Sequence, residues 1–225
     1  METIILSLGG SLIVPEKIDV GYLKLFRELI LKYATLDKKF VIVTGGGKIC
    51  RRYQNAAETV SNISDEEADW IGVAATKLNA ALVKGIFEDL AYEEVITNPN
   101  TKIKTDKKII VASGWKPGFS SDMDAVLLAK NLGAKTVINL TNIDYVYNKD
   151  PKKYEDAEKI ERISWKDFRN IVGEEWDPGL NVPFDPVASK EAAEAGLKVI
   201  ITNGRDLRNL EKIFEGKKSE GTIIE

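Results

Sequence analysis

The sequence predicts an α/β protein, a three-layer αβα sandwich with a mostly parallel central sheet. Apolar, β-prone runs alternate with helical segments along the chain, and several of these runs stop at glycine-rich or hydroxyl-rich loops. Strands that alternate with helices form a parallel sheet with helices on both faces. With 225 residues, 44% of them hydrophobic, and no linker-like or repeated stretch, the chain is expected to fold as a single domain over residues 1–225.

The first strand is expected at 3–8 and the first helix at 20–33. Residues 3–8 are apolar and end at a Gly-Gly-Ser turn. Apolar residues recur with helical spacing over 20–33, and Asp19 is a suitable N-cap. This helix should cover one face of the sheet.

A second strand that ends at glycine is expected at 40–44. Three glycines, 45–47, follow it, and a basic segment over 48–58 is compatible with a helix. Glycine lacks a Cβ and accepts positive φ, so such a turn brings backbone N–H groups close to an anion, and the positive end of the helix dipole adds to the attraction. The alternative is that the glycines only allow the strand and the helix to pack closely.

Two known phosphate motifs do not fit this turn. A P-loop requires glycine and a hydroxyl residue at the positions of Ile42 and Ile49, and the dinucleotide fingerprint requires glycine at the position of Cys50. An anion site at this turn would therefore be neither a P-loop nor a dinucleotide-binding turn.

A long helix and two short strands are expected next. Ser64 and Glu67 have the spacing of a capping box, which predicts a helix that continues to residue 87. Residues 92–96 and 108–112 have the composition of short strands.

A loop rich in glycine and hydroxyl groups follows at 113–122, before a helix expected at about 122–131. Hydroxyls and backbone N–H groups at the start of a helix suit a phosphate, and Lys116 adds positive charge. Asp122 is by default the N-cap of that helix; the alternative is a carboxylate directed into a site.

The last third of the chain begins with a strand at 135–140, which ends at the polar loop 141–151. Open α/β sheets bind ligands at the carboxyl ends of their strands, although a simple turn closed by Asp150 and Pro151 explains the pattern equally well. The remaining expected segments are an exposed charged stretch at 152–159, a loop at 176–186, helices at 186–195 and 206–214, and strands at 197–202 and 222–224.

The composition excludes several functions. The chain has no histidine, so Ser-His triads and histidine-ligated zinc are excluded. The net charge of −3, with both signs mixed along the chain, gives no overall basic field for nucleic acid. The single cysteine, Cys50, fits a reducing cytoplasm. The first residues lack the basic region of a signal peptide, and no apolar run approaches the roughly 20 residues of a membrane helix.

In a parallel sheet, four candidate anion or nucleotide loops should lie on one rim. These loops are residues 9–11, 45–51, 116–122 and 141–150. Convergence of all four would be difficult to explain by turn formation alone.

These segments resemble the amino acid kinase family and, within it, the archaeal-type uridylate (UMP) kinases. The resemblance covers essentially the whole chain and keeps the family's order. The residues that carry it are 7–11, 45–51, 69–79, 117–122, 141–151 and 185–190. The resemblance implies ATP-dependent phosphorylation of UMP to UDP with Mg2+, in pyrimidine nucleotide biosynthesis, by a homohexamer. It also implies that the N-terminal part binds the acceptor and that the part from about residue 135 binds ATP.

The resemblance implies specific roles. Arg51 and Asp122 would be catalytic, and the metal would be held mainly by nucleotide phosphates rather than by side chains. The residues expected at ATP are Gly10, Ser11, Gly47, Arg51, Thr141, Asn142, Tyr147 and Asp150. The residues expected at UMP are Gly46, Asp69, Lys116, Pro117, Gly118, Phe119, Ser120, Ser121 and Asp122.

Three departures from the family pattern keep alternatives open. Ser7 occupies a position where many relatives have lysine, Phe119 replaces a histidine of the UMP loop, and Trp115 stands where threonine is common. One alternative is a family member that phosphorylates a carboxylate or carbamate, such as acetylglutamate kinase. The other is a non-catalytic nucleotide or oxyanion binder. The absence of histidine argues against isopentenyl phosphate and fosfomycin kinases.

Overall fold

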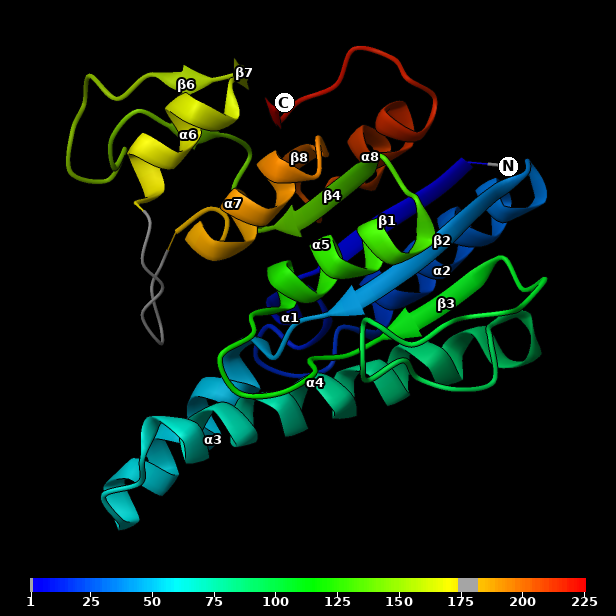
Figure 1. The fold of residues 1–225 in the computed structure, drawn as a ribbon, viewed down its shortest axis with the longest axis horizontal. Helices are drawn as coiled ribbons and strands as arrows, with labels where there is room; N and C mark the ends of the chain where they lie inside the picture. Colours follow the sequence, from blue (N-terminus) through cyan, green and yellow to red (C-terminus); the bar gives the residue numbers. More distant parts are fainter. Residues whose placement is uncertain (1, 174–181) are drawn as a thin grey trace.

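The structure, a computed structural model, describes residues 2–173 and 182–225. Within these residues a seven-stranded sheet has the order β3-β2-β1-β4-β8-β9-β7 (Figure 1). Its strands are β1 (Glu2–Leu8), β2 (Lys38–Thr44), β3 (Ile109–Ala112), β4 (Thr136–Thr141), β7 (Arg162–Ile163), β8 (Lys198–Asn203) and β9 (Thr222–Ile224). The pairs are parallel except β8 with β9. A small antiparallel pair, β5 (Val146–Tyr147) with β6 (Lys159–Ile160), lies beside the sheet.

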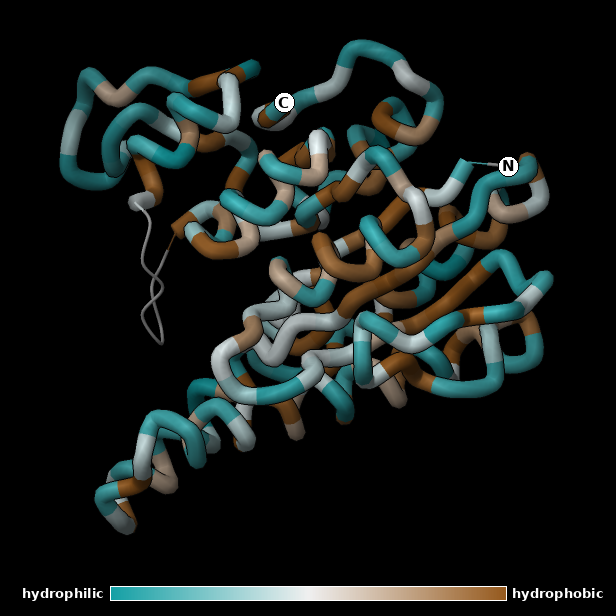
Figure 2. Tube along the Cα trace, viewed as in Figure 1, coloured by the Kyte–Doolittle hydropathy of each residue, from teal (hydrophilic) through white to brown (hydrophobic). Residues whose placement is uncertain are grey.

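Strand β1 lies between β2 and β4 in the sheet and fixes where the neighbouring loops emerge. Its last residue, Leu8, pairs with Thr44 at the end of β2 and with Leu140 near the end of β4. The turns after these three strands therefore begin side by side at the carboxyl edge. The central strands are hydrophobic along their length (Figure 2), as expected for strands that are covered on both faces.

Helices cover both faces of the sheet and give two cores, which confirms the predicted sandwich. Leu6 and Leu8 of β1 point into one core and Ile5 into the other, because side chains alternate along a strand. The first core is covered by α1 (Gly10–Ile13), α2 (Val20–Thr35), α4 (Asp65–Phe87) and α8 (Leu207–Phe214), and the second by α5 (Ser121–Leu132), α6 (Trp165–Val172) and α7 (Pro186–Glu194). Helix α3 (Gly47–Val60) packs along α4, and together they project beyond the body (Figure 1).

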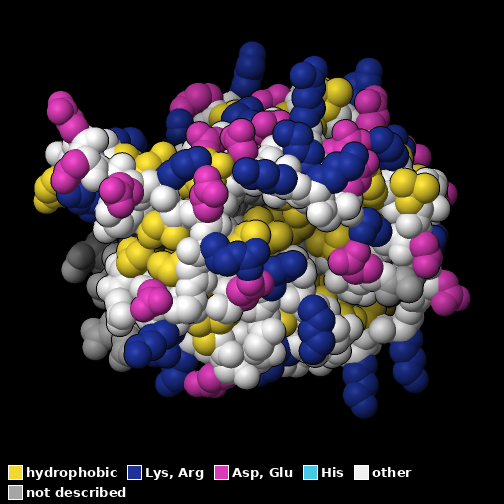
Figure 3. Space-filling view, turned by 90° about the horizontal axis from the view of Figure 1, so that it is seen from above, with side chains coloured by type: hydrophobic (Ala, Val, Ile, Leu, Met, Phe, Trp, Pro, Cys, Tyr) yellow, Lys and Arg dark blue, Asp and Glu magenta, His cyan; other side chains and the backbone are white. Residues whose placement is uncertain are grey.

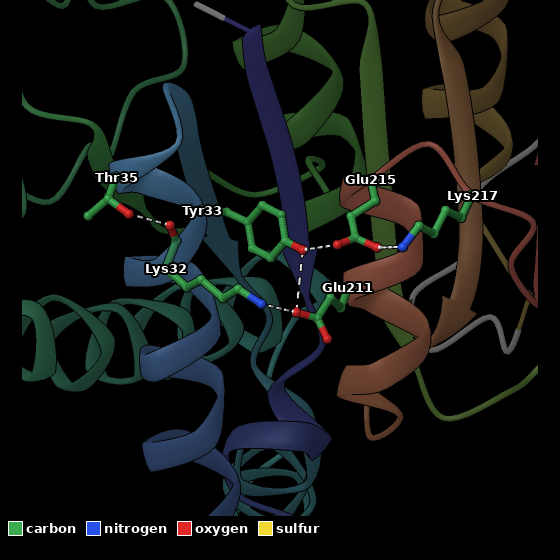
Figure 4. A network of polar contacts seen from close by, with 6 residues as sticks. All are labelled: Lys32, Tyr33, Thr35, Glu211, Glu215 and Lys217. Atoms are coloured by element: carbon green, nitrogen blue, oxygen red, sulfur yellow. Dashed lines mark hydrogen bonds and ion pairs between the residues drawn. The ribbon is translucent and has the colours of Figure 1, made fainter.

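A polar network joins α2 to α8 at the edge of the first core (Figure 4). The Tyr33 hydroxyl lies 2.9 Å from Glu215 Oε1 and 3.3 Å from Glu211 Oε1. Lys32 and Lys217 balance these carboxylates. Burial, with the two glutamates, raises the pKa of Tyr33, so the hydroxyl stays protonated and can donate. This network connects α2 to α8 and the segment that follows it.

Most expected elements are found near their expected bounds, and both predicted caps are confirmed. Asp19 accepts from the Tyr22 N–H, and Ser64 accepts from the Glu67 N–H. The strand expected at 92–96 is wrong: there only isolated bridges join Ala91 to Ile109 and Ile96 to Ala112. The elements that were not expected are α1, the short 3-10 helix η1 (Glu88–Leu90), α6 and β5 to β7.

Charged side chains of both signs are mixed on the face shown in Figure 3. This distribution agrees with the small net charge of the chain. No helix within the described part of the chain is long and apolar enough to cross a membrane. Part of the loop expected at 176–186, residues 176–181, lies outside the described residues.

Candidate active site

Two glycine turns pack backbone against backbone at the carboxyl edge. A Cβ added at Gly10 would lie 2.4 Å from the Gly47 nitrogen and 2.5 Å from the Gly45 oxygen, which is too close for any side chain. Gly47 also has φ +66°, a value that favours glycine. The Gly9 N–H donates to the Leu140 carbonyl oxygen at 3.0 Å, so the turn after β1 also meets the end of β4. The glycines therefore bring three strand ends into contact.

Helix α4 supports the second glycine turn through side chains. Asn79, which is buried, donates from Nδ2 to the Gly45 carbonyl oxygen at 2.8 Å, and Thr44 donates from Oγ1 to the Thr76 carbonyl oxygen at 2.9 Å. Asn79 and Thr76 were not among the expected site residues. The signal that could have identified them is their position in the family-like segment 69–79.

A cavity of about 700 Å³ opens beside the glycine turns, between α3, α4, the β3–α5 loop (residues 113–120) and the start of α5. Among the expected site residues, it is lined by Gly46, Gly47, Arg51, Asp69, Lys116, Phe119 and Ser121. Sequence reasoning did not assign to the site the lining residues Cys50, Gln54, Asn55, Glu58, Asp65, Ala68, Gly72, Val73, Thr76 and Gly114. Most of these residues lie on the facing sides of α3 and α4, which become apparent only when the two helices are paired.

Arg51 is the basic residue of α3 for which the described residues provide no ion-pair partner. Its neighbours on the helix, Lys48 and Arg52, both form ion pairs with Glu16 in the loop before α2. Arg51 has no ion-pair partner among the described residues and lines the cavity close to Gly47. A free guanidinium beside backbone N–H groups at the start of a helix is suited to phosphate.

The β3–α5 loop is held by hydrogen bonds to α4. The Gly114 N–H donates to Thr76 Oγ1, and the Gly118 N–H donates to Asp69 Oδ2, both at 2.9 Å. Gly118 has φ +78°, so the tight bend after Pro117 requires glycine.

Aromatic and cationic side chains of this loop form a cluster at the cavity. The Lys116 Nζ lies 4.2 Å from the centre of the Trp115 ring and 5.0 Å from that of Phe119. The two rings meet edge to face at 4.8 Å. This combination provides a positive charge and a flat apolar surface, which suit a phosphorylated molecule that carries a ring.

The default role of Asp122 as an N-cap is wrong, because Ser120 caps α5 by accepting from the Met123 N–H. Asp122 points instead toward the junction of β1, β4 and α7. It accepts from Ser7 Oγ at 3.2 Å, from the Asp185 N–H at 3.2 Å and from Asn139 Nδ2 at 3.5 Å. Burial, together with the charge of Asp185, raises the pKa of Asp122 to about 7.

A second carboxyl of α5, Asp124, also has a pKa raised to about 7 by burial, and the charge of Asp122 contributes. Both groups keep a proton in the native state up to about pH 7, whereas the unfolded chain releases it near pH 3.8. Their stabilising contribution is therefore complete below pH 3.8 and is lost as the pH rises through about 7.

We therefore expect the unfolding free energy to fall between pH 6 and 8.5, by on the order of 1 kcal/mol for each carboxyl. No histidine titrates in this interval. Thermal melts should show Tm decreasing by about 5 °C in total, and Asp124→Asn, which cannot ionise, should show a smaller decrease. Asp206→Asn, at the exposed cap of α8, is the control and should keep the full decrease. A Tm independent of pH would contradict this account.

The residues expected at the adenosine lie at the end of β4 and beyond it, outside the cavity lining. Thr141 ends β4, and its hydroxyl donates to Asn142 Oδ1 at 3.3 Å. Tyr147 is in β5, and Asp150 accepts from the Lys152 N–H at 2.9 Å in an exposed turn. Only Thr141 lies directly beside the β1 turn, because it follows Leu140, which bonds to Gly9. Gly10 and Ser11, at the start of α1, lie between the cavity and this region.

Comparison with known proteins agrees with this geometry. The family model described as the amino acid kinase family matches residues 2–203. The chain is 34% identical to a uridylate kinase of Pyrococcus abyssi, with 99% of each chain covered, and 35% identical to one of Thermoplasma volcanium, with 100% of this chain and 98% of the other covered. The crystal structure of a uridylate kinase from Archaeoglobus fulgidus superposes with a TM-score of 0.83 at 31% identity, and each chain is covered completely.

A UMP kinase structure from Bacillus anthracis, at 22% identity and a TM-score of 0.80, shares the fold, with 99% of this chain and 95% of the other covered. The paired glycine turns, the parallel sheet and the match along residues 2–203 agree. The chain belongs to the amino acid kinase family.

Proposed function

We propose that this protein is an ATP-dependent UMP kinase of pyrimidine nucleotide biosynthesis. In the proposed reaction an oxygen of the UMP phosphate attacks the γ-phosphorus of ATP. The bond between that phosphorus and the β,γ-bridging oxygen breaks, and the products are UDP and ADP. The kinases of Pyrococcus abyssi, Thermoplasma volcanium and Archaeoglobus fulgidus, each more than 30% identical along the chain, support this choice of acceptor.

The observation that carries the proposal is the contact between the Gly10 and Gly47 turns beside the cavity. Donor phosphates would bind the backbone N–H groups at Gly10, Ser11 and Gly47, and the acceptor would occupy the cavity. Arg51, which lines the cavity with Gly47, would lie between the two nucleotides and would face the phosphoryl group in transfer. Phosphoryl transfer requires mainly that two anions be held in line while their charge is balanced, and this arrangement provides both.

The acceptor side would be formed by α4 and the β3–α5 loop. Gly46 and Lys116 would bind the UMP phosphate, Asp69 the ribose hydroxyls, and Phe119 the base. In this arrangement Pro117, Gly118, Ser120 and Ser121 would shape the loop around the nucleotide, and Asp122 would be a catalytic residue. Thr141, Asn142, Tyr147 and Asp150 would receive the adenosine, so that the part of the chain before about residue 135 binds the acceptor and the part after it binds ATP.

The chemistry fits a chain without histidine. The UMP phosphate is already ionised near neutral pH, so its oxygen needs no general base. The charge that develops would be balanced by Arg51, by the backbone N–H groups and by Mg2+. We assign Mg2+ mainly to the nucleotide phosphates, because Mg2+ is commonly held by substrate phosphates with only one or two protein carboxylates.

The leading alternative within the family is a kinase for a carboxylate or carbamate. Trp115, Lys116 and Phe119 argue against it, since such acceptors have no base to contact aromatic rings. A non-catalytic nucleotide binder is the alternative from another class. Ser7, which is buried and bonded to Asp122 where many relatives carry lysine, is the feature that favours it.

A substrate panel separates these functions. ATP turnover is measured as ADP release with UMP, CMP, AMP, acetylglutamate or carbamate as acceptor, with and without EDTA. We expect turnover with UMP at least about tenfold above every other acceptor, and its loss with EDTA. Turnover with only a carboxylate or carbamate would support the family alternative, and calorimetric binding of nucleotides without turnover would support the non-catalytic one.

We further propose that the enzyme is a cytoplasmic homo-oligomer, a hexamer by family likeness. The projecting α3 and α4 carry exposed apolar side chains, including Tyr53 at 64% and Val60 at 87% exposure, as well as Trp70 and Leu78. Exposed apolar patches of this kind commonly mark protein interfaces. Light scattering on the purified chain tests the proposal, and a mass of 25.0 kDa, that of one chain, would contradict it.

A further inference from the structure

Asp124 is a buried carboxylate that the proposed reaction does not use. It lies in the first turn of α5, its exposure is 0%, and it is absent from the cavity lining. Its Oδ2 accepts the backbone N–H of Trp115 at 3.2 Å, and its Oδ1 has no hydrogen-bond partner among the described residues. A buried carboxylate with one oxygen that has no hydrogen-bond partner destabilises the fold. The presence of Asp124 at this position therefore calls for a functional explanation, and its single hydrogen bond indicates one.

The bond from Asp124 reaches the start of the segment that lines the cavity. The Trp115 ring contacts Phe119 edge to face, and the Lys116 ammonium lies over both rings. Lys116 and Phe119 are cavity residues. A hydrogen bond that holds the Trp115 backbone therefore also holds the Trp115 ring, which both of these side chains contact.

The other anchors of the loop differ from Asp124 in one respect. Thr76 holds Gly114, and Asp69 holds Gly118, but Thr76 and Asp69 line the cavity themselves. Their replacement would change the cavity directly. Among these three anchors, only Asp124 holds the loop without lining the cavity.

We propose that Asp124 is a positioning residue for acceptor binding, which holds the Trp115 N–H and thereby keeps Lys116 and Phe119 in place on the cavity wall. This inference rests on the proposed function of the cavity. Both the ionised and the protonated carboxyl keep an acceptor oxygen, so asparagine, which also has one, is a close substitute.

Asp124→Ala removes the acceptor oxygen and tests the proposal. When the loop is in place for only part of the time, the apparent affinity falls by that fraction. We expect KM for UMP to rise about tenfold, with kcat changed less than about threefold and KM for ATP unchanged. The separate variant Asp124→Asn should have a KM for UMP within about twofold of that of the unsubstituted protein. The control Asp206→Ala removes a comparable carboxylate bond at the start of α8 and should change neither KM.

Hydrogen exchange tests the tether without nucleotide and without activity. In the unsubstituted protein the Trp115 N–H should exchange at least about tenfold more slowly than the Lys116 N–H. The backbone N–H of Lys116 has no hydrogen-bond partner among the described residues. Asp124→Ala should remove this difference, and Asp124→Asn should keep it.

The proposal is overturned if the two amides exchange equally in the unsubstituted protein, a result that does not depend on whether Asp124→Ala folds. It is also overturned if Asp124→Ala leaves KM for UMP unchanged, or if Asp124→Asn behaves like Asp124→Ala in KM and in exchange. Failure of the proposed function looks different: the exchange difference would persist while the unsubstituted protein shows no turnover with UMP.

Discussion

Arg51→Ala is expected to lower kcat for UDP formation by about 10²- to 10³-fold while Tm changes by less than about 2 °C. The guanidinium lies on the cavity wall beside Gly47 and has no ion-pair partner among the described residues. Its removal therefore breaks no salt bridge in the part of the chain that the structure describes. Arginines that face a transferring phosphoryl group act mainly on the transition state, where their loss costs several orders of magnitude.

Arg52→Ala is the matched control for this variant. Arg52 is the next residue on α3, it pairs with Glu16, and it does not line the cavity. We expect its loss to change kcat less than about threefold, because an exposed ion pair contributes little. Steady-state kinetics and thermal melts on both variants provide the comparison. Equal losses of activity, or a large fall in Tm for Arg51→Ala alone, would mean that Arg51 has a structural role.

Gly10→Ala is expected to reduce activity by at least about 100-fold and to lower the unfolding free energy by on the order of 3 kcal/mol. The added methyl group would lie within 2.4 to 2.5 Å of three backbone atoms in the Gly45–Gly47 turn. Backbone atoms cannot rotate away as a side chain can, so the two turns must separate. Their separation would displace the N–H groups assigned to the ATP phosphates.

Gly85→Ala provides the control for adding a methyl group. Gly85 lies within α4, and a Cβ placed there meets nothing within 4 Å. Alanine is the better helix former, so the unfolding free energy of this variant should be higher by about 0.5–1 kcal/mol, and its activity should be unchanged. Chemical denaturation and the UMP assay measure both effects. If Gly10→Ala were as stable and active as Gly85→Ala, the close contact of the two turns would be wrong.

The architecture could be predicted from the sequence because its signals are local. Alternating apolar and helical segments and the caps at Asp19 and Ser64 depend on residues close in the chain, and the structure contains them. Residues 92–96 are apolar enough for a strand but pair with β3 only through single bridges. Short strands depend on partners distant in the sequence, which local patterns do not specify.

The candidate site was predictable in its parts but not in its contacts. The glycine turns and the β3–α5 loop were expected on one rim, and the parallel register places them there. The local sequence predicts a helix cap at Asp122, because the contacts of its side chain with Ser7, Asn139 and Asp185 involve residues 17 to 115 positions away. Asp124 carried no sequence signal at all, since its importance depends on burial.

A crystal structure with UMP and a non-hydrolysable ATP analogue tests the central claim most directly. The account predicts UMP in the cavity, with its phosphate near Arg51, and the γ-phosphate of the analogue at the Gly10 and Gly47 turns, in line with the attacking oxygen. Nucleotides bound on separate surfaces, or a UMP phosphate that points away from the glycine turns, would contradict it.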